Sequence, residues 1–278
     1  MNNIFYIVAN DAYAKKLVIF LESWLHRLGD FSNLICGIDN ADSYLVKEIL
    51  NRYGVKAEVV QFPNSLFDNF LEIYDGNFPQ VYELMKVKFL KLHLFNFQET
   101  GVIYGDIDGF IANESIKKII DHDFQKISYY VKSEEWSIKT DIVNFTKIST
   151  SFFTKPRNFP NLKDIIDFIK SNKHEFNEMR VSGVVDQPVV NYYLFKNQVF
   201  YPESIHEHFQ DFFWGINTID FSEFEVGGDG ISVGQMKLPY IHHSKNFEYS
   251  IAADLYEAFY KAKAIERDSG LIKLVNLN

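Results

Sequence analysis

Residues 102–111 read Val-Ile-Tyr-Gly-Asp-Ile-Asp-Gly-Phe-Ile. The apolar run at the start of this stretch predicts a buried strand that ends in two carboxylates, Asp106 and Asp108. Because side chains alternate between the faces of an extended chain, both carboxylates should point the same way while Ile107 points into the protein. Neighbouring carboxylates repel each other unless a positive charge lies between them. Hard divalent cations such as Mg²⁺ or Mn²⁺ take oxygen ligands, so the stretch predicts a metal site.

An alternation of strands and helices precedes this stretch. Apolar runs at 4–9, 34–38 and 55–61 predict strands, and apolar residues at three- and four-residue spacing predict helices after the first two. This order is typical of a parallel sheet with right-handed crossovers. We therefore expect an α/β fold in which a mixed, mainly parallel central sheet is flanked by helices.

Polar residues follow the predicted strands, and ligands bind at the carboxyl ends of strands in such sheets. The candidates at these ends are Asn10, Asp11, Tyr13, Asp39 and Asn40. No Gly-x-Gly-x-x-Gly motif follows the first strand, which argues against a dinucleotide cofactor.

The second half of the chain is less regular. Helices are predicted over 80–97, 114–120, 162–170 and 247–266, and short strands over 126–131 and 238–241. Residues 133–161 lack a clear period and are interpreted as irregular or short-stranded, and the tail at 270–275 as a terminal strand or disordered. No linker or repeat is evident, so we expect one domain over 1–278.

Composition narrows the classes of function. The net charge of −9 and the lack of a Lys/Arg block argue against a nucleic-acid partner. The single cysteine, Cys36, fits a reducing compartment, and no apolar run approaches the ~20 residues of a membrane span. A soluble cytoplasmic protein with no transmembrane segment is expected.

Four segments carry a resemblance to a known family. They are Ala9-Asn10-Asp11-x-Tyr13, the Asp-x-Asp strand at 102–108, Asp186-Gln187-Pro188-x-x-Asn191, and Ile-His-His-Ser-Lys at 241–245. In this order the chain resembles GT-A fold nucleotide-sugar glycosyltransferases, a Rossmann-like fold. It is most similar to the retaining family 8, the glycogenin- and galactosyltransferase-like group.

The resemblance implies a metal-dependent transfer of a sugar from a nucleotide-diphosphate donor, with UDP expected, to a glycan, glycolipid or protein acceptor. It implies Mn²⁺ or Mg²⁺ held by Asp106, Asp108 and His243 or His242, with His243 favoured. Asp186 and Gln187 would lie by the reactive carbon of the sugar. The implied donor-binding residues are Ala9, Asn10, Tyr13, Asp39, Lys86 or Lys88, Asp106, Ile107 and Lys245.

The resemblance also divides the chain into a nucleotide-binding half (1–110), an acceptor and donor-sugar half (111–246), and a C-terminal helix and tail (247–278). One segment departs from the family. Between the metal strand and Asp186, only Val181-Ser182-Gly183 stands where the family has a small-residue turn of the Asn-Ser-Gly type. The donor sugar and the retaining stereochemistry are therefore left open.

Two other functions remain as alternatives. A haloacid-dehalogenase-type phosphohydrolase would use Asp106 as nucleophile and Asp108 as general acid with Mg²⁺. Its motif usually continues with Thr, where this chain has Phe110, and usually opens the domain. The second alternative is a non-catalytic protein that binds a sugar nucleotide.

Overall fold

The fold is taken from a computed structural model of the chain. The structure describes residues 3–39, 43–60, 90–97, 101–121, 129–132, 148–155, 161–172, 190, 192–193, 196–197, 203–204, 224–227, 230–233, 236–237, 240–242 and 250–276. In the strands between 203 and 242 only the backbone is described.

The helices and strands follow one another in an α/β order. They are β1 (Ile4–Ala9), the 3₁₀ helix η1 (Asp11–Tyr13), α1 (Ala14–Leu28), β2 (Leu34–Ile38), α2 (Tyr44–Tyr53), β3 (Lys56–Val59), the 3₁₀ helix η3 (Lys91–Asn96), β4 (Val102–Gly105), β5 (Gly109–Ile111), α5 (Ile116–Ile120), β6 (Tyr129–Lys132), β7 (Ile148–Lys155), α6 (Leu162–Ser171), β8 (Glu203–Ser204), β9 (Phe224–Gly227), β10 (Gly230–Val233), β11 (Met236–Lys237), β12 (Tyr240–His242), α10 (Ser250–Arg267) and α11 (Ser269–Val275).

The central sheet has seven strands in the order β3-β2-β1-β4-β7-β6-β8. Strand β1 lies between β2 and β4 and is parallel to both, and β3 is parallel to β2. Strand β7 is antiparallel to both of its neighbours, β4 and β6. The mixed, mainly parallel sheet predicted from the sequence is confirmed.

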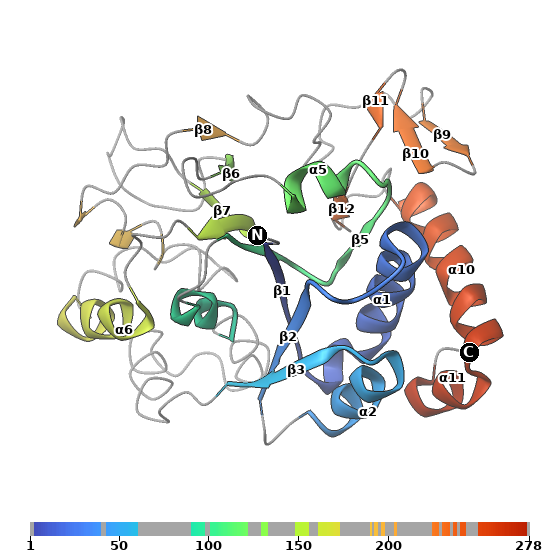
Figure 1. The fold of residues 1–278 in the computed structure, drawn as a ribbon, viewed down its shortest axis with the longest axis horizontal. Coiled ribbons are helices and arrows are strands. Elements are labelled where there is room, and N and C mark those ends of the chain that lie inside the picture. Colours follow the sequence, from blue (N-terminus) through green and yellow to red (C-terminus); the bar gives the residue numbers. More distant parts are fainter. Residues whose placement is uncertain are drawn as a thin grey trace.

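Helices cover both faces of this sheet, as the contacts of β1 on each face illustrate. Its residues Phe5, Ile7 and Ala9 belong to the core shared with α1 and α2. On the other face, the Tyr6 hydroxyl donates to the carbonyl oxygen of Leu90 at 3.1 Å, just before η3. A strand buried on both faces is typical of a parallel sheet. Figure 1 shows α1 and α2 on one side of the sheet and α6 on the other, with α10 packed on α1.

Strand β7 corrects the interpretation of residues 133–161 as irregular or short-stranded. It has eight residues and pairs along β4, with Tyr104 opposite Phe153 and Gly105 opposite Phe152. Both phenylalanines are fully buried. Adjacent strand residues face opposite ways, so two buried neighbours mean that β7 is covered on both faces. Its sequence therefore lacks the alternation of polar and apolar residues that is typical of a half-exposed strand.

The C-terminal tail is also different from the prediction. Residues 269–275, expected as a strand or disordered, form helix α11. The Asp268 carboxylate accepts hydrogen bonds from the backbone N–H groups of Gly270 at 2.9 Å and Leu271 at 3.0 Å. This is an N-cap. Leu271 and Val275, one helical turn apart, are both buried in the core.

A buried carboxylate joins α10 to the rest of the domain. Glu22 of α1 has a side chain that is 1% exposed. Its oxygens accept from the Arg267 guanidinium at 2.7 and 3.2 Å and from the Tyr53 hydroxyl at 2.6 Å. Charge-assisted bonds of this kind satisfy a group that is costly to bury alone.

Replacing Arg267 with alanine is expected to destabilise the fold. The substitution removes two bonds from Glu22, and leaving such a group unsatisfied costs about 1–3 kcal/mol. Chemical denaturation measures this loss. Arg52→Ala is the matched control, because Arg52 pairs with Glu48 and Asp268 at the surface, where ion pairs contribute little. Equal losses in the two variants would contradict the assignment of Glu22 as the cause.

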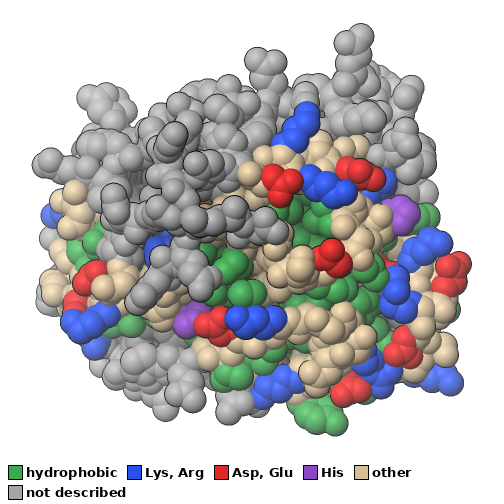
Figure 2. Space-filling view, in the orientation of Figure 1, with side chains coloured by type: hydrophobic (Ala, Val, Ile, Leu, Met, Phe, Trp, Pro, Cys, Tyr) green, Lys and Arg blue, Asp and Glu red, His purple; other side chains and the backbone are tan. Residues whose placement is uncertain are grey.

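Positive and negative side chains are mixed on the described surface in Figure 2, and the sequence likewise has no block of Lys and Arg. On the face shown in Figure 2, described Lys and Arg side chains lie among Asp and Glu side chains instead of gathering in one patch. Within the described part of the chain, no helix combines the length and the apolar character needed to cross a membrane.

Candidate active site

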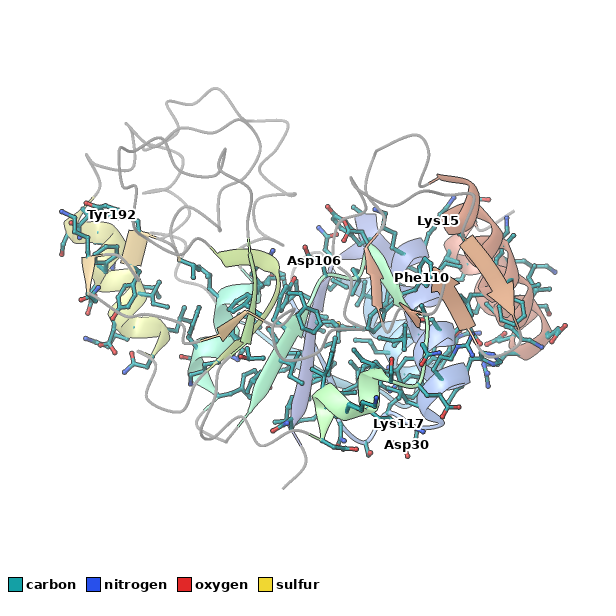
Figure 3. The ribbon with its side chains drawn as sticks, turned by 90° about the horizontal axis from the view of Figure 1, so that it is seen from above. Lys15, Asp30, Asp106, Phe110, Lys117 and Tyr192 are labelled. Atoms are coloured by element: carbon teal, nitrogen blue, oxygen red, sulfur yellow. The ribbon has the colours of Figure 1, made fainter. Side chains whose placement is uncertain are left out.

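The site lies where the order of the strands reverses. From β1 the chain continues to β2 and β3 on one side, and it returns to β4 on the other side of β1. Crevices at such switch points, at the carboxyl ends of the strands, are the usual ligand sites of open α/β sheets. A pocket opens there, lined by Val8, Tyr13, Lys91, Tyr104, Asp106, Ile107 and Asp108. In Figure 3, Asp106 marks this end of the strands, while Asp30 and Lys117 lie at the opposite end.

The two carboxylates of the Asp-x-Asp motif reach the pocket together, as predicted. The local backbone differs from the prediction, however. Strand β4 ends at Gly105, β5 begins at Gly109, and the residues between them form a turn instead of continued strand. Ile107 is 4% exposed and packs in the core, which anchors the turn. Both carboxylates therefore face the pocket because the turn holds them there.

Asp106 is held by two donors. The Tyr104 hydroxyl donates to Asp106 Oδ1 at 2.5 Å, and Lys91 Nζ lies 3.3 Å from the same oxygen. The Lys91 ammonium also lies 5.1 Å from the centre of the Tyr104 ring, within the range of a cation–π contact. The Lys91 side chain is only 6% exposed, so little solvent screens its charge.

Asp108 has a more open setting. Lys16 Nζ lies 3.9 Å from Asp108 Oδ2, and the Lys16 side chain is 48% exposed. Tyr13, just before α1, faces the same space. Burial, and then the charges of Asp108 and Asp106, raise the pKa of Tyr13 to about 12. The phenol is therefore neutral at physiological pH, and it offers the pocket an aromatic surface and a hydroxyl group.

Three further predicted residues lie at the ends of β1 and β2. Ala9 is fully buried as the last residue of β1. Asn10 is 5% exposed, and its side-chain oxygen has no hydrogen-bond partner among the described residues. Asp39 is half-buried after β2. None of the three is among the described residues that line the pocket.

Neighbouring Asp11 has a structural role instead. Its carboxylate accepts a hydrogen bond from the backbone N–H of Val46 at 2.9 Å, in the first turn of α2. A carboxylate in this position stabilises a helix N-terminus. The bond ties η1, which carries Tyr13, to α2.

Strand β12, which ends at His242, lies next to the Asp-x-Asp turn. Strand β12 pairs antiparallel with β5, with Tyr240 opposite Ile111, Ile241 opposite Phe110, and His242 opposite Gly109. The backbone of β12 therefore ends next to the residue that follows Asp108. Segments more than 130 positions apart in sequence, at Gly109 and His242, meet at one point.

Several predicted site residues lie outside the described residues. They are Lys86, Lys88, Asp186, Gln187, His243 and Lys245, and for His242 the backbone alone is described. Among described residues, no group of three His, Cys, Asp or Glu side chains could hold a metal ion. Of the residues predicted to hold a metal ion, the structure describes the side chains of Asp106 and Asp108.

Three residues that line the pocket, Val8, Lys91 and Tyr104, were not predicted from the sequence as site residues, and two of them are polar. Tyr104 lies two positions before Asp106, and residues at that spacing share a face of a strand, which is a usable signal. Lys91 falls in the helix predicted over 80–97, and lysines on a helix usually keep their charged ends in solvent. Its neighbours Leu90 and Leu92 are both buried, and a lysine inside such an apolar run is the signal for a buried ammonium.

The donor set of this pocket fits a hard divalent cation. Two carboxylates supply the oxygen ligands that Mg²⁺ and Mn²⁺ prefer. The cavity has about 80 Å³ of space, and a water molecule occupies about 30 Å³ of liquid. The pocket that both carboxylates line therefore has room for an ion with some of its water.

Comparisons with known proteins support the fold. The chain matches no protein-family model and no curated protein. Among solved structures, an active-site variant of LgtC matches with a TM-score of 0.52 at 11% identity, over 91% of this chain and 95% of that chain.

Two further solved structures match with lower scores. Mouse xyloside xylosyltransferase 1 has a TM-score of 0.49 at 11% identity, over 88% of this chain and 99% of that one. The galactosyltransferase LgtC with donor and acceptor sugar analogs has a TM-score of 0.47 at 15% identity, over 67% and 69%. Identities this low bear on the fold and not on the substrate. The chain has the GT-A fold of the glycosyltransferases, as its sequence resemblance implied.

Proposed function

We propose that the protein is a metal-dependent glycosyltransferase that moves a sugar from a nucleotide-diphosphate donor to an acceptor hydroxyl group, with UDP as the expected nucleotide. The observation that carries this proposal is the meeting of three segments at the switch point. Tyr13 of η1 and the Asp-x-Asp turn line one pocket at the carboxyl ends of the strands, and β12 pairs with β5 directly after that turn.

Each segment has a role in the proposal. Asp106 and Asp108 would hold Mn²⁺ or Mg²⁺, with His243, or alternatively His242, completing the ligands from the chain around the end of β12. Tyr13 would stack on the base, and Asn10 and Asp39 would hydrogen-bond the base or the ribose. Lys245 would meet the diphosphate. All described residues that line the pocket fall within 1–110, which supports this part as the nucleotide-binding half.

The reaction is an exchange of bonds at the anomeric carbon of the donor. The bond from that carbon to the diphosphate oxygen breaks, and its electron pair leaves with the nucleoside diphosphate. The acceptor oxygen forms the new glycosidic bond and releases its proton. A bound divalent cation supplies Lewis-acid stabilisation of the leaving diphosphate. Asp186 and Gln187 would lie by the anomeric carbon, and retention of its configuration is part of the proposal.

The structure offers less support to a phosphohydrolase of the haloacid-dehalogenase type. Its nucleophile would be Asp106, which follows β4, and β4 is antiparallel to β7. The expected core of that phosphohydrolase fold is a parallel sheet in which the aspartate strand comes first, and neither condition is met here.

A thermal-shift panel tests the proposal. Ligands that bind only the native state raise its stability, by about 2.7 kcal/mol at a hundred times the dissociation constant. We expect UDP with Mn²⁺ to raise the melting temperature more than either one alone. Orthophosphate and orthovanadate with Mg²⁺ serve as probes of a phosphohydrolase. Stabilisation by vanadate but not by any nucleotide would support the phosphohydrolase, and no response to any nucleotide diphosphate would overturn the proposed function.

A further inference from the structure

Lys91 stands out because it places a buried positive charge inside the predicted cation site. Its ammonium lies 3.3 Å from Asp106 Oδ1 and is only 6% exposed. By contrast, Lys16, a second described lysine near the carboxylates, is 48% exposed and lies 3.9 Å from Asp108. Solvent therefore screens the charge of Lys91 poorly and that of Lys16 well.

A cation bound by the Asp106 carboxylate would share that carboxylate with the Lys91 ammonium. The two positive charges repel each other, and in a buried position this repulsion is strong. Lys91 should therefore weaken the binding of a bare divalent ion. A diphosphate in the same pocket attracts both positive charges, so its arrival offsets the repulsion.

We propose that Lys91 makes cation binding depend on the diphosphate: the site binds a divalent ion weakly alone and tightly together with a nucleoside diphosphate. This inference rests on the proposed function for the identity of the diphosphate. Its first half, the weak binding of the bare ion, depends only on Lys91 and the two carboxylates. By linkage, the ion strengthens nucleotide binding by the same factor as the nucleotide strengthens ion binding.

The packing around Lys91 allows its charge to be removed while a side chain of similar length still fills the space. Its side chain lies over the Tyr104 ring, and its neighbours along η3, Leu92 and Leu94, are fully buried. Methionine is apolar, flexible and close to lysine in length, so it can fill this space. Lys91→Gln offers a second neutral side chain should the methionine variant fail to fold, and Lys91→Arg keeps the charge.

The experiment titrates metal-free protein with Mn²⁺ and follows free Mn²⁺ by electron paramagnetic resonance, with and without saturating UDP. For the unchanged protein we expect UDP to tighten Mn²⁺ binding within the roughly 5–150-fold range of typical couplings. Lys91→Met should bind Mn²⁺ alone about tenfold more tightly, and the effect of UDP should shrink by a similar factor. Lys91→Arg should behave as the unchanged protein does.

Lys16→Met is the matched control, since it removes the exposed lysine beside Asp108. Because solvent and salt screen that charge, its effect on Mn²⁺ binding should stay below about threefold. The inference is overturned if folded Lys91→Met or Lys91→Gln binds Mn²⁺ alone no more tightly than the unchanged protein. It is equally overturned if Lys91→Arg matches the neutral variants.

The two proposals fail in different ways in this experiment. If UDP changes Mn²⁺ binding in none of the proteins, the nucleotide-diphosphate function fails. The titrations without UDP still decide whether Lys91 opposes the bare ion. If UDP tightens Mn²⁺ binding equally in all variants, the result supports the proposed function and contradicts the role of Lys91 in coupling the two ligands.

Discussion

Asp108→Ala is expected to abolish the stabilisation by UDP with Mn²⁺ and to lower sugar transfer by at least about a thousandfold. A metal ion contributes several kcal/mol to the stabilisation of charge in a transition state, and each 1.36 kcal/mol is about tenfold in rate. Asp108 lines the pocket, and its side chain is 28% exposed, with Lys16 Nζ 3.9 Å away. Ion pairs of exposed groups contribute little to stability, so loss of this carboxylate should act mainly on the cation and little on the fold.

The measurements for this prediction are the thermal shift with UDP and Mn²⁺ and the rate of donor consumption. Asp30→Ala is the control, because Asp30 lies at the opposite end of the sheet (Figure 3). The Asp30 carboxylate accepts a bond from the backbone N–H of Ser32 and takes no part in the pocket. A thermal shift by UDP and Mn²⁺ that survives in Asp108→Ala would remove this carboxylate from the metal site.

Tyr13→Ala is expected to weaken UDP binding by about 1–3 kcal/mol, the contribution of one stacked base to binding. Tyr13 lines the pocket beside both carboxylates, and its position before α1 is anchored by the backbone bond from its N–H to the carbonyl of Asn10 at 2.9 Å. A stacking platform of this kind needs the ring and not the hydroxyl. Tyr13→Phe should therefore keep most of the affinity.

Calorimetric titration of UDP in the presence of Mn²⁺ measures both Tyr13 variants. The raised pKa of Tyr13, about 12, adds an expectation for pH. A raised pKa in a phenol means that the neutral form persists to higher pH, so Tyr13 should cause no change in affinity between neutral and mildly alkaline solution. If Tyr13→Phe lost as much affinity as Tyr13→Ala, the hydroxyl and not the ring would be the binding group.

The first half of the fold could be predicted closely because its signals are local. The strands at 4–9 and 34–38 are observed with the predicted bounds as β1 and β2. The helix after β2, expected to stop near Gly54, ends at Tyr53, and Gly54 has a φ of +68° that glycine adopts without strain. Hydrophobic periodicity and a terminating glycine are properties of short segments, so neighbours in the fold were not needed to recognise them.

The second half depended on pairing that the sequence does not display. Strand β7 was missed because burial on both faces removes polar alternation. The helix predicted over 80–97 is described only at its end, where η3 has 3₁₀ geometry. The contact of Lys91, on that segment, with Asp106 could not be predicted, because Asp106 lies 15 residues further along the chain.

The sequence by itself determined the α/β class, the Asp-x-Asp carboxylates and Tyr13 as a pocket residue, because each follows from residue types at short spacing. Only the tertiary structure decided which residues from distant parts of the chain lie next to these carboxylates and Tyr13. The turn between β4 and β5 presents both carboxylates, the pairing of β12 with β5 brings the histidine segment to Gly109, and η3 places Lys91 on Asp106. These contacts depend on chain crossovers and on burial, and neither is encoded within a short window of sequence.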